Sequence, residues 1–182
     1  RSGNLITMNE VVSEVGSDAI RYMMISRNAD KKIDFDLDVF LQKNKDNPVF
    51  YIQYAYARCS SIIAIAKEKL GDEFIFSSKI IKNLIDLKLN EEKQIIKQVC
   101  NFYNVIKCSA QNYEPHRISN FLYDLAKTFH NYWSLGNIDD TKRIIIKEDL
   151  AVSKSRLLLV LAVKSVIKKG LDILKIDCPE NM

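Results

Sequence analysis

Residues 46–65 read D-N-P-V-F-Y-I-Q-Y-A-Y-A-R-C-S-S-I-I-A-I, and this stretch decides the fold. Asp46 or Asn47 can cap a helix that starts at Pro48, because the first helical position needs no N–H and suits the fixed φ of proline. The next twenty residues or so contain no Gly or Pro, which predicts a helix of about six turns. At about 100° per residue, one apolar stripe gathers on a face that we expect to meet the core: Ile52, Ala55, Cys59, Ile62, Ile63 and Ala66.

A second ridge runs beside that stripe, formed by Tyr51, Tyr54 and Arg58 at i, i+3 and i+7. Two aromatic rings and a planar guanidinium on one ridge can stack unpaired bases, worth about 1–3 kcal/mol per base. The alternative is amphipathic packing of half-buried tyrosines beside a solvated arginine. Spacing alone favours this alternative.

The composition limits which classes of protein this chain can belong to. The chain has 182 residues, a 47% apolar fraction, 5 Gly and 3 Pro, which indicates a folded, helix-rich protein. A net charge of +4 permits a nucleic-acid partner without requiring one. The longest apolar run, residues 157–163, is too short to cross a bilayer, and the first residues do not read as a secretory signal. We therefore expect a cytoplasmic protein without a membrane span.

The sequence offers no catalytic constellation. His116 and His130 are separated by an apolar seam, which favours a structural or solvated role for each, and no phosphate-cradling glycine loop is present. Without a C-x-x-C pair, the four cysteines are expected to be reduced and mostly buried: Cys59, Cys100, Cys108 and Cys178. We therefore expect that this chain alone does not make or break a covalent bond.

Helical periodicity continues along the chain. Residues that can cap or start a helix are Thr7 with Glu10, Ser17 or Asp18, Asp36 or Asp38, Ser77 or Ser78, Asn90, and Pro115. A last helix is predicted over residues 153–174. The polar stretch 136–147 is expected to be a long connection. We predict an all-α bundle of about seven helices. A small helical connector, residues 1–40, precedes the main domain, residues 41–182.

Several motifs resemble the C-terminal part of arginyl-tRNA synthetases, which are class I aminoacyl-tRNA synthetases. The match runs in order through R-S-G-N (1–4), similar to the end of a K-M-S-K-R-x-G-N loop, and G-S-D-A-I-R (16–21), similar to the D-A-L-R signature. It continues through D-F-D-L-D (34–38), the helix at 46–58, E-P-H-R-I-S-N-F-L-Y-D-L-A-K-T-F-H-N-Y-W (114–133) and G-L-D-I-L-K-I-D-C-P-E-N-M (170–182). Tyr56 stands where that family usually has His, and Trp133 where Tyr or Phe is commoner.

The resemblance implies a helical bundle that binds the anticodon stem and loop of an arginine tRNA, and it reverses the preference for the packing interpretation of the tyrosine ridge. The implied contact residues are Tyr51, Tyr54, Arg58, Met182, Lys43, Asn44, Asn47, Tyr132 and Trp133. ATP and magnesium would serve a catalytic domain that lies outside this chain, which is expected to be a fragment without a cofactor of its own. The intact enzyme is expected to be a monomer that joins arginine to its tRNA.

Two other interpretations remain open at this stage. Another synthetase with a D-A-L-R signature, such as the cysteinyl enzyme, would keep tRNA as the partner. A helical protein-interaction module without any role for RNA would fit the modest charge and the scattered lysines.

Overall fold

The computed structural model describes residues 7–31, 36–71 and 87–182. Those residues form an all-α structure, which confirms the expected fold class. They contain seven α-helices and one short 3-10 helix: α1 (Met8–Val15), α2 (Ser17–Ile25), α3 (Leu37–Leu41), α4 (Pro48–Leu70), α6 (Asn90–Asn112), α7 (His116–Ile138), η2 (Asp140–Lys142) and α8 (Leu150–Leu174). The helix predicted to start at Ser77 or Ser78 lies largely outside the described residues.

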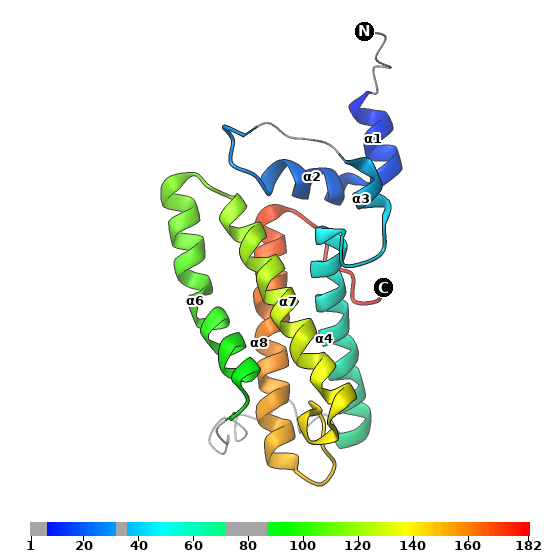
Figure 1. The fold of residues 1–182 in the computed structure, drawn as a ribbon, viewed down its shortest axis with the longest axis vertical. Coiled ribbons are helices and arrows are strands. Elements are labelled where there is room, and N and C mark those ends of the chain that lie inside the picture. The colour runs from blue at the N-terminus through cyan, green and yellow to red at the C-terminus, as the bar shows by residue number, and fades with distance from the viewer. Residues whose placement is uncertain (1–6, 32–35, 72–86) are drawn as a thin grey trace.

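Four long helices build the body of the molecule. α4, α6, α7 and α8 run along its long axis, α2 lies across one end of them, and α1 and α3 lie at that same end (Figure 1). α7 packs against α4, α6 and α8, and α8 also packs against α4 and α6. A single core therefore lies between the four long helices.

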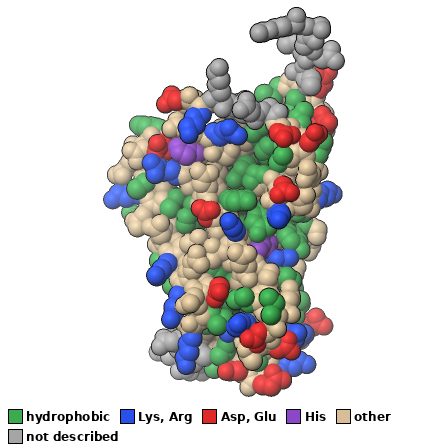
Figure 2. All heavy atoms as spheres, in the orientation of Figure 1, with side chains coloured by type: hydrophobic (Ala, Val, Ile, Leu, Met, Phe, Trp, Pro, Cys, Tyr) green, Lys and Arg blue, Asp and Glu red, His purple; other side chains and the backbone are tan. Residues whose placement is uncertain are grey.

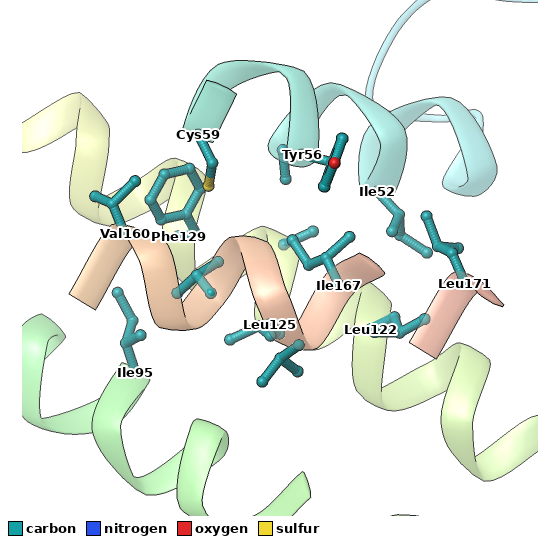
Figure 3. Close-up of a cluster of buried hydrophobic side chains, with 14 of the residues drawn as sticks. Ile52, Tyr56, Cys59, Ile95, Leu122, Leu125, Phe129, Val160, Ile167 and Leu171 are labelled. Atoms are coloured by element: carbon teal, nitrogen blue, oxygen red, sulfur yellow. The ribbon is translucent and has the colours of Figure 1, made fainter. Parts of the chain in front are cut away.

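The stripe predicted for α4 is confirmed. Its members Ile52, Ala55, Cys59 and Ala66 are fully buried, and Ile62 and Ile63 are almost so. In Figure 3, Ile52 and Cys59 of this stripe face side chains of α7 and α8 such as Phe129, Ile167 and Leu171. The predicted start is also confirmed, because α4 begins at Pro48 and the Oδ1 of Asn47 accepts a hydrogen bond from the N–H of Phe50 at 3.2 Å.

One glycine sets how closely two of these helices approach. A Cβ atom added to Gly170 of α8 would lie 2.6 Å from the Cδ2 of Leu122 on α7, so any larger residue would force either the Leu122 side chain or the helices to shift. Both residues are buried.

Several helix ends differ from expectation because other groups provide the caps. Asp149 caps α8, which begins three residues before Ser153, and the Ser153 hydroxyl is buried against the backbone of Ile146. α7 continues through Gly136 to Ile138, into the stretch expected to be a connection. Asn90 was predicted to cap α6 but is its first residue, and the cap is Leu89, whose N–H donates to the Oε2 of Glu92.

All four cysteines lie in described residues and are free, but the expectation that they are mostly buried is wrong. Cys59 is buried, Cys178 is half-buried, and Cys100 and Cys108 are exposed on α6. Among the helices of the described ranges, none has the length and apolarity that crossing a bilayer requires.

Candidate nucleic-acid interface

Arg58 joins two aromatic rings from different helices. Its guanidinium carbon lies 4.4 Å from the centroid of the Tyr54 ring and 3.9 Å from that of the Trp133 ring on α7. The Nη2 of Arg58 also donates a hydrogen bond of 2.8 Å to the Tyr54 hydroxyl. The cation therefore holds the two rings in one arrangement, which we call the Tyr54–Arg58–Trp133 stack.

His130 holds Arg58 from the interior side. The Arg58 Nη1 lies 2.7 Å from the His130 Nδ1, and the His130 Nε2 lies 3.2 Å from the Tyr51 carbonyl oxygen. Because arginine can only donate, we assign Nδ1 as the acceptor and Nε2 as the protonated nitrogen that donates to Tyr51. Burial is the main cause that lowers the pKa of His130 to about 4, and the nearby Arg58 charge lowers it further, so the imidazole is neutral at pH 7.

The sequence did not assign this role to His130, for which we expected a structural or solvated role. Its partner Arg58 is 72 residues away in the chain. The signal available was local: His130 precedes Trp133 by three residues, so both lie on the same side of a helix.

Tyr51 packs against α7 more closely than a free stacking platform would. Its ring centroid lies 4.4 Å from that of His130 and 5.7 Å from that of Tyr123, and the side chain is half-buried. Burial raises the pKa of its hydroxyl. Tyr51 therefore supports the stack from behind through His130.

The Tyr54–Arg58–Trp133 stack lines a surface hollow of about 340 Å³. This volume lies near the lower end of the range of small-ligand sites, about 300–1,000 Å³. The remaining lining residues come from α4 and the C-terminal segment: Ala57, Ser61, Ile62, Ile65, Asn181 and Met182. We call this the first hollow.

The C-terminal segment, residues 175–182, is held along α4 and brings Met182 to the first hollow. α8 ends at Leu174, and the capping residue Lys175 has a φ of 57°, in the left-handed region. The Gln53 amide nitrogen then donates to the Asp177 carbonyl at 3.0 Å. Further on, Glu180 accepts from Lys164 at 3.0 Å. The predicted proximity of Met182 to Tyr54 and Arg58 is thus present, with Met182 51% exposed.

Two predicted contact residues are corrected by the structure. Tyr132 is 1% exposed, and its hydroxyl donates to the buried Glu92 carboxylate at 3.1 Å, so its ring belongs to the core. Asn47 is 5% exposed. Its amide donates to the carbonyls of Phe40 and Gln42 at 2.8 and 3.0 Å while its Oδ1 caps α4, so its polar atoms serve the fold.

Lys43 and Asn44 are exposed in the loop before α4, and neither lines the first hollow. The structure thus brings together four of the predicted residues, Tyr54, Arg58, Trp133 and Met182, with Tyr51 behind them. Their role in binding stays a prediction.

The molecular surface carries charges of both signs. On the face shown in Figure 2, basic and acidic side chains alternate around hydrophobic ones. Within the described ranges, no group of three His, Cys, Asp or Glu side chains is placed to hold a metal ion. The arrangement is suited to stacking and packing against a planar ligand.

The fold and the site together define an all-α domain with a surface hollow that is lined by aromatic rings, which an arginine holds in place. The DALR anticodon binding domain family matches residues 52–182, which is most of the chain. The chain belongs to this family.

The relatives are consistent with that assignment. An arginine–tRNA ligase from Allorhizobium ampelinum is 40% identical over 182 residues, and one from Rhizobium rhizogenes is 41% identical over 183. All of this chain is covered, and it spans 31% of the length of each. A solved structure from Campylobacter jejuni, assigned as an arginyl-tRNA synthetase, superposes with a TM-score of 0.80 at 26% identity, covering 100% of this chain and 37% of that one.

Proposed function

We propose that this chain is the anticodon-binding region of an arginyl-tRNA synthetase and that it binds an arginine tRNA at the first hollow. The observation that carries the proposal is the Tyr54–Arg58–Trp133 stack, which lines a hollow at the surface with Met182. The family match and the ligase names of the relatives support it. Since these names specify arginine, they favour that enzyme over the cysteinyl one.

The geometry changes the role of Arg58 from the one that spacing suggested. Tyr54 and Trp133 already lie against its guanidinium, so Arg58 is engaged by aromatic rings of the protein itself. It instead fixes the two rings before RNA arrives, which lowers the entropic cost of ordering them on binding. An unpaired base then packs against Tyr54, Trp133 and Met182.

The longer protein would join arginine to its tRNA, with ATP and magnesium bound in a domain outside this chain. We further propose that residues 1–40 connect that domain to the bundle of residues 41–182. Action as a cytoplasmic monomer is also a proposal, which light scattering of the intact enzyme and its localisation in cells would test.

A salt titration tests the proposed function. Arginine tRNA is titrated into the 182-residue chain at several salt concentrations, with fluorescence anisotropy as the readout. We expect the logarithm of the affinity to fall linearly with that of the salt concentration, because phosphate contacts release counterions. Absence of binding at low salt would overturn the proposal.

A matched pair of tyrosine substitutions locates the site. Tyr54→Ala should weaken tRNA binding by about five- to 30-fold, because a stacking ring is lost. Tyr103→Ala removes a 72% exposed ring from α6, and Lys93→Ala removes an exposed charge from the same helix, so both should leave binding unchanged. Equal effects of all three substitutions would contradict the location of the binding site.

A protein-interaction module is the alternative function. It would be favoured by a stable complex with a protein that buries the same face and survives nuclease treatment.

A further inference from the structure

A second hollow adjoins the first one. It measures about 190 Å³ and is lined by Ile62, Ile65, Trp133, Gly136, Asn137, Arg143, Ile144 and Ile145. Trp133, Ile62 and Ile65 also line the first hollow. The two hollows are therefore neighbours along one surface and share an aromatic wall. At this volume the second hollow lies below the usual size of a small-ligand site, about 300 Å³, and suits a single planar group.

One wall of the second hollow is the loop of residues 143–145, which lies close against α7. The position of a Cβ atom on Gly136 is only 3.1 Å from the Cα of Arg143, so a side chain at this position would move the loop outward by a few tenths of an ångström. The Arg143 Nε donates to the Gly136 carbonyl at 3.2 Å. The stem of Arg143 is thereby fixed beside the last turn of α7.

A buried ion pair holds the same loop from beneath. The Arg156 Nη1 donates to the carbonyls of Arg143 and Thr141 at 2.6 and 2.9 Å, and its Nε donates to Glu92 at 2.8 Å. Arg156 and Glu92 are 6% and 1% exposed. The wall is therefore held in place in the free protein.

The polar groups of the second hollow suit a nucleotide. Asn137 is exposed at its edge and offers both a donor and an acceptor to a base. Among the described residues, the ion-pair partner of Arg143 is Asp140, at 2.7 Å and largely exposed to solvent, and such a pair is weak enough for a phosphate to replace. The apolar remainder, with the Trp133 ring, suits the face of the base.

We infer that the second hollow takes one unpaired nucleotide of the RNA loop, adjacent in sequence to the nucleotide in the first hollow. Trp133 separates the two bases, Asn137 contacts the edge of the second base, and Arg143 pairs with its phosphate. This inference rests on the proposed function, since it places the second base relative to the first.

The test blocks the second hollow while leaving the first intact. Asn137→Trp places a bulky ring at its edge, and Ile138→Trp puts the same ring on the next residue, which is 85% exposed and does not line the hollow. The probe is an RNA hairpin with the anticodon stem and loop of an arginine tRNA, together with versions that lack one loop base at a time. Thermal unfolding confirms that each variant is folded.

With the unmodified chain, removal of either of two adjacent loop bases should weaken binding by about five- to 30-fold. Asn137→Trp should cause a loss of similar size with the intact hairpin, and little further loss with the hairpin that lacks the second base. Ile138→Trp should behave as the unmodified chain does.

The two proposals fail in different ways. If Tyr54→Ala weakens binding while Asn137→Trp and Ile138→Trp are equal and only one loop base matters, the second subsite is wrong and the proposed function stands. If the hairpin and the whole tRNA both fail to bind at low salt, the proposed function itself is wrong, and the second subsite falls with it.

Discussion

At the scale of single residues, the site depends on one neutral histidine. His130 accepts from Arg58 and donates to the backbone of Tyr51, and it can do both only while its Nδ1 carries no proton. Protonation would place two cations 2.7 Å apart and remove the acceptor. The arrangement of the Tyr54–Arg58–Trp133 stack is therefore linked to pH.

This linkage predicts a stability difference between acid and neutral solution. The pKa of His130 is about 4 in the folded chain against an ordinary value of 6.5, so between these pH values the unfolded state binds a proton that the folded state does not. Stability should consequently fall as the pH drops from about 6.5 towards 4, with about 3 kcal/mol due to this group. The measurement is urea unfolding at pH 7.5 and pH 5.

The variant His130→Gln isolates the contribution of this imidazole, which is needed because the carboxylates of the chain titrate in the same pH range. We expect the variant to be less stable at pH 7.5 and to lose less stability on acidification than the unmodified chain. An identical loss in both proteins would show that His130 does not carry the linkage.

At the scale of helices, the buried pair of Glu92 and Arg156 joins α6 to α8 and also holds the loop after α7. The Glu92 carboxylate accepts from Arg156, from the Tyr132 hydroxyl and from the Leu89 N–H, so its charge is compensated by several donors. Loss of one partner would leave a buried charge without compensation.

Arg156→Met should therefore destabilise the chain by about 3–5 kcal/mol. The double variant Glu92→Gln with Arg156→Met should be more stable than Arg156→Met alone, since the uncompensated charge is gone. Denaturant unfolding measures both, with Lys169→Met on the exposed face of α8 as a control expected to lie within about 0.5 kcal/mol of the unmodified chain. A double variant no more stable than the single one would rule out the charge as the cause.

Periodicity predicted the helices well and the site in part. The buried stripe of α4 follows from spacing alone, and the same rule, applied to α7, would have excluded Tyr132, which lies three residues after the buried Phe129. Trp133 is the next residue, about 100° further round the helix, and it lines the hollow. Asn47 was predicted both as a cap and as a contact residue, and capping uses its polar atoms.

Contacts between distant segments could not be predicted from spacing. His130 meets Arg58 across 72 residues, and the loop carrying Arg143 lies close against α7 at Gly136, which leaves room for it. Local patterns determine which face of a helix is apolar, but they do not specify the partner that a polar side chain finds on another helix. Met182 was placed near the ridge by resemblance to a family and not by its own spacing.

At the scale of the whole molecule, Asp18 connects three parts of the chain. Its Oδ2 accepts from the Gln53 amide of α4 at 3.0 Å and from the Asp177 N–H at 3.2 Å. Gln53 donates in addition to the Asp177 carbonyl. The end of the molecule formed by α1, α2 and α3 is thus tied to the same C-terminal segment that carries Met182 to the first hollow (Figure 1).

Asp18→Ala should loosen this connection. We expect faster amide exchange both in α2 and in residues 176–182, and a loss of RNA affinity of a few-fold because Met182 is held less firmly. Asp30→Ala, an exposed substitution in the turn after α2, should change neither. Asp18 also lies in the first turn of α2, where a carboxylate stabilises the helix. Exchange that rises in α2 but not in residues 176–182 would therefore mean that only the helix has frayed, and that Asp18 does not transmit the position of α2 to the hollow.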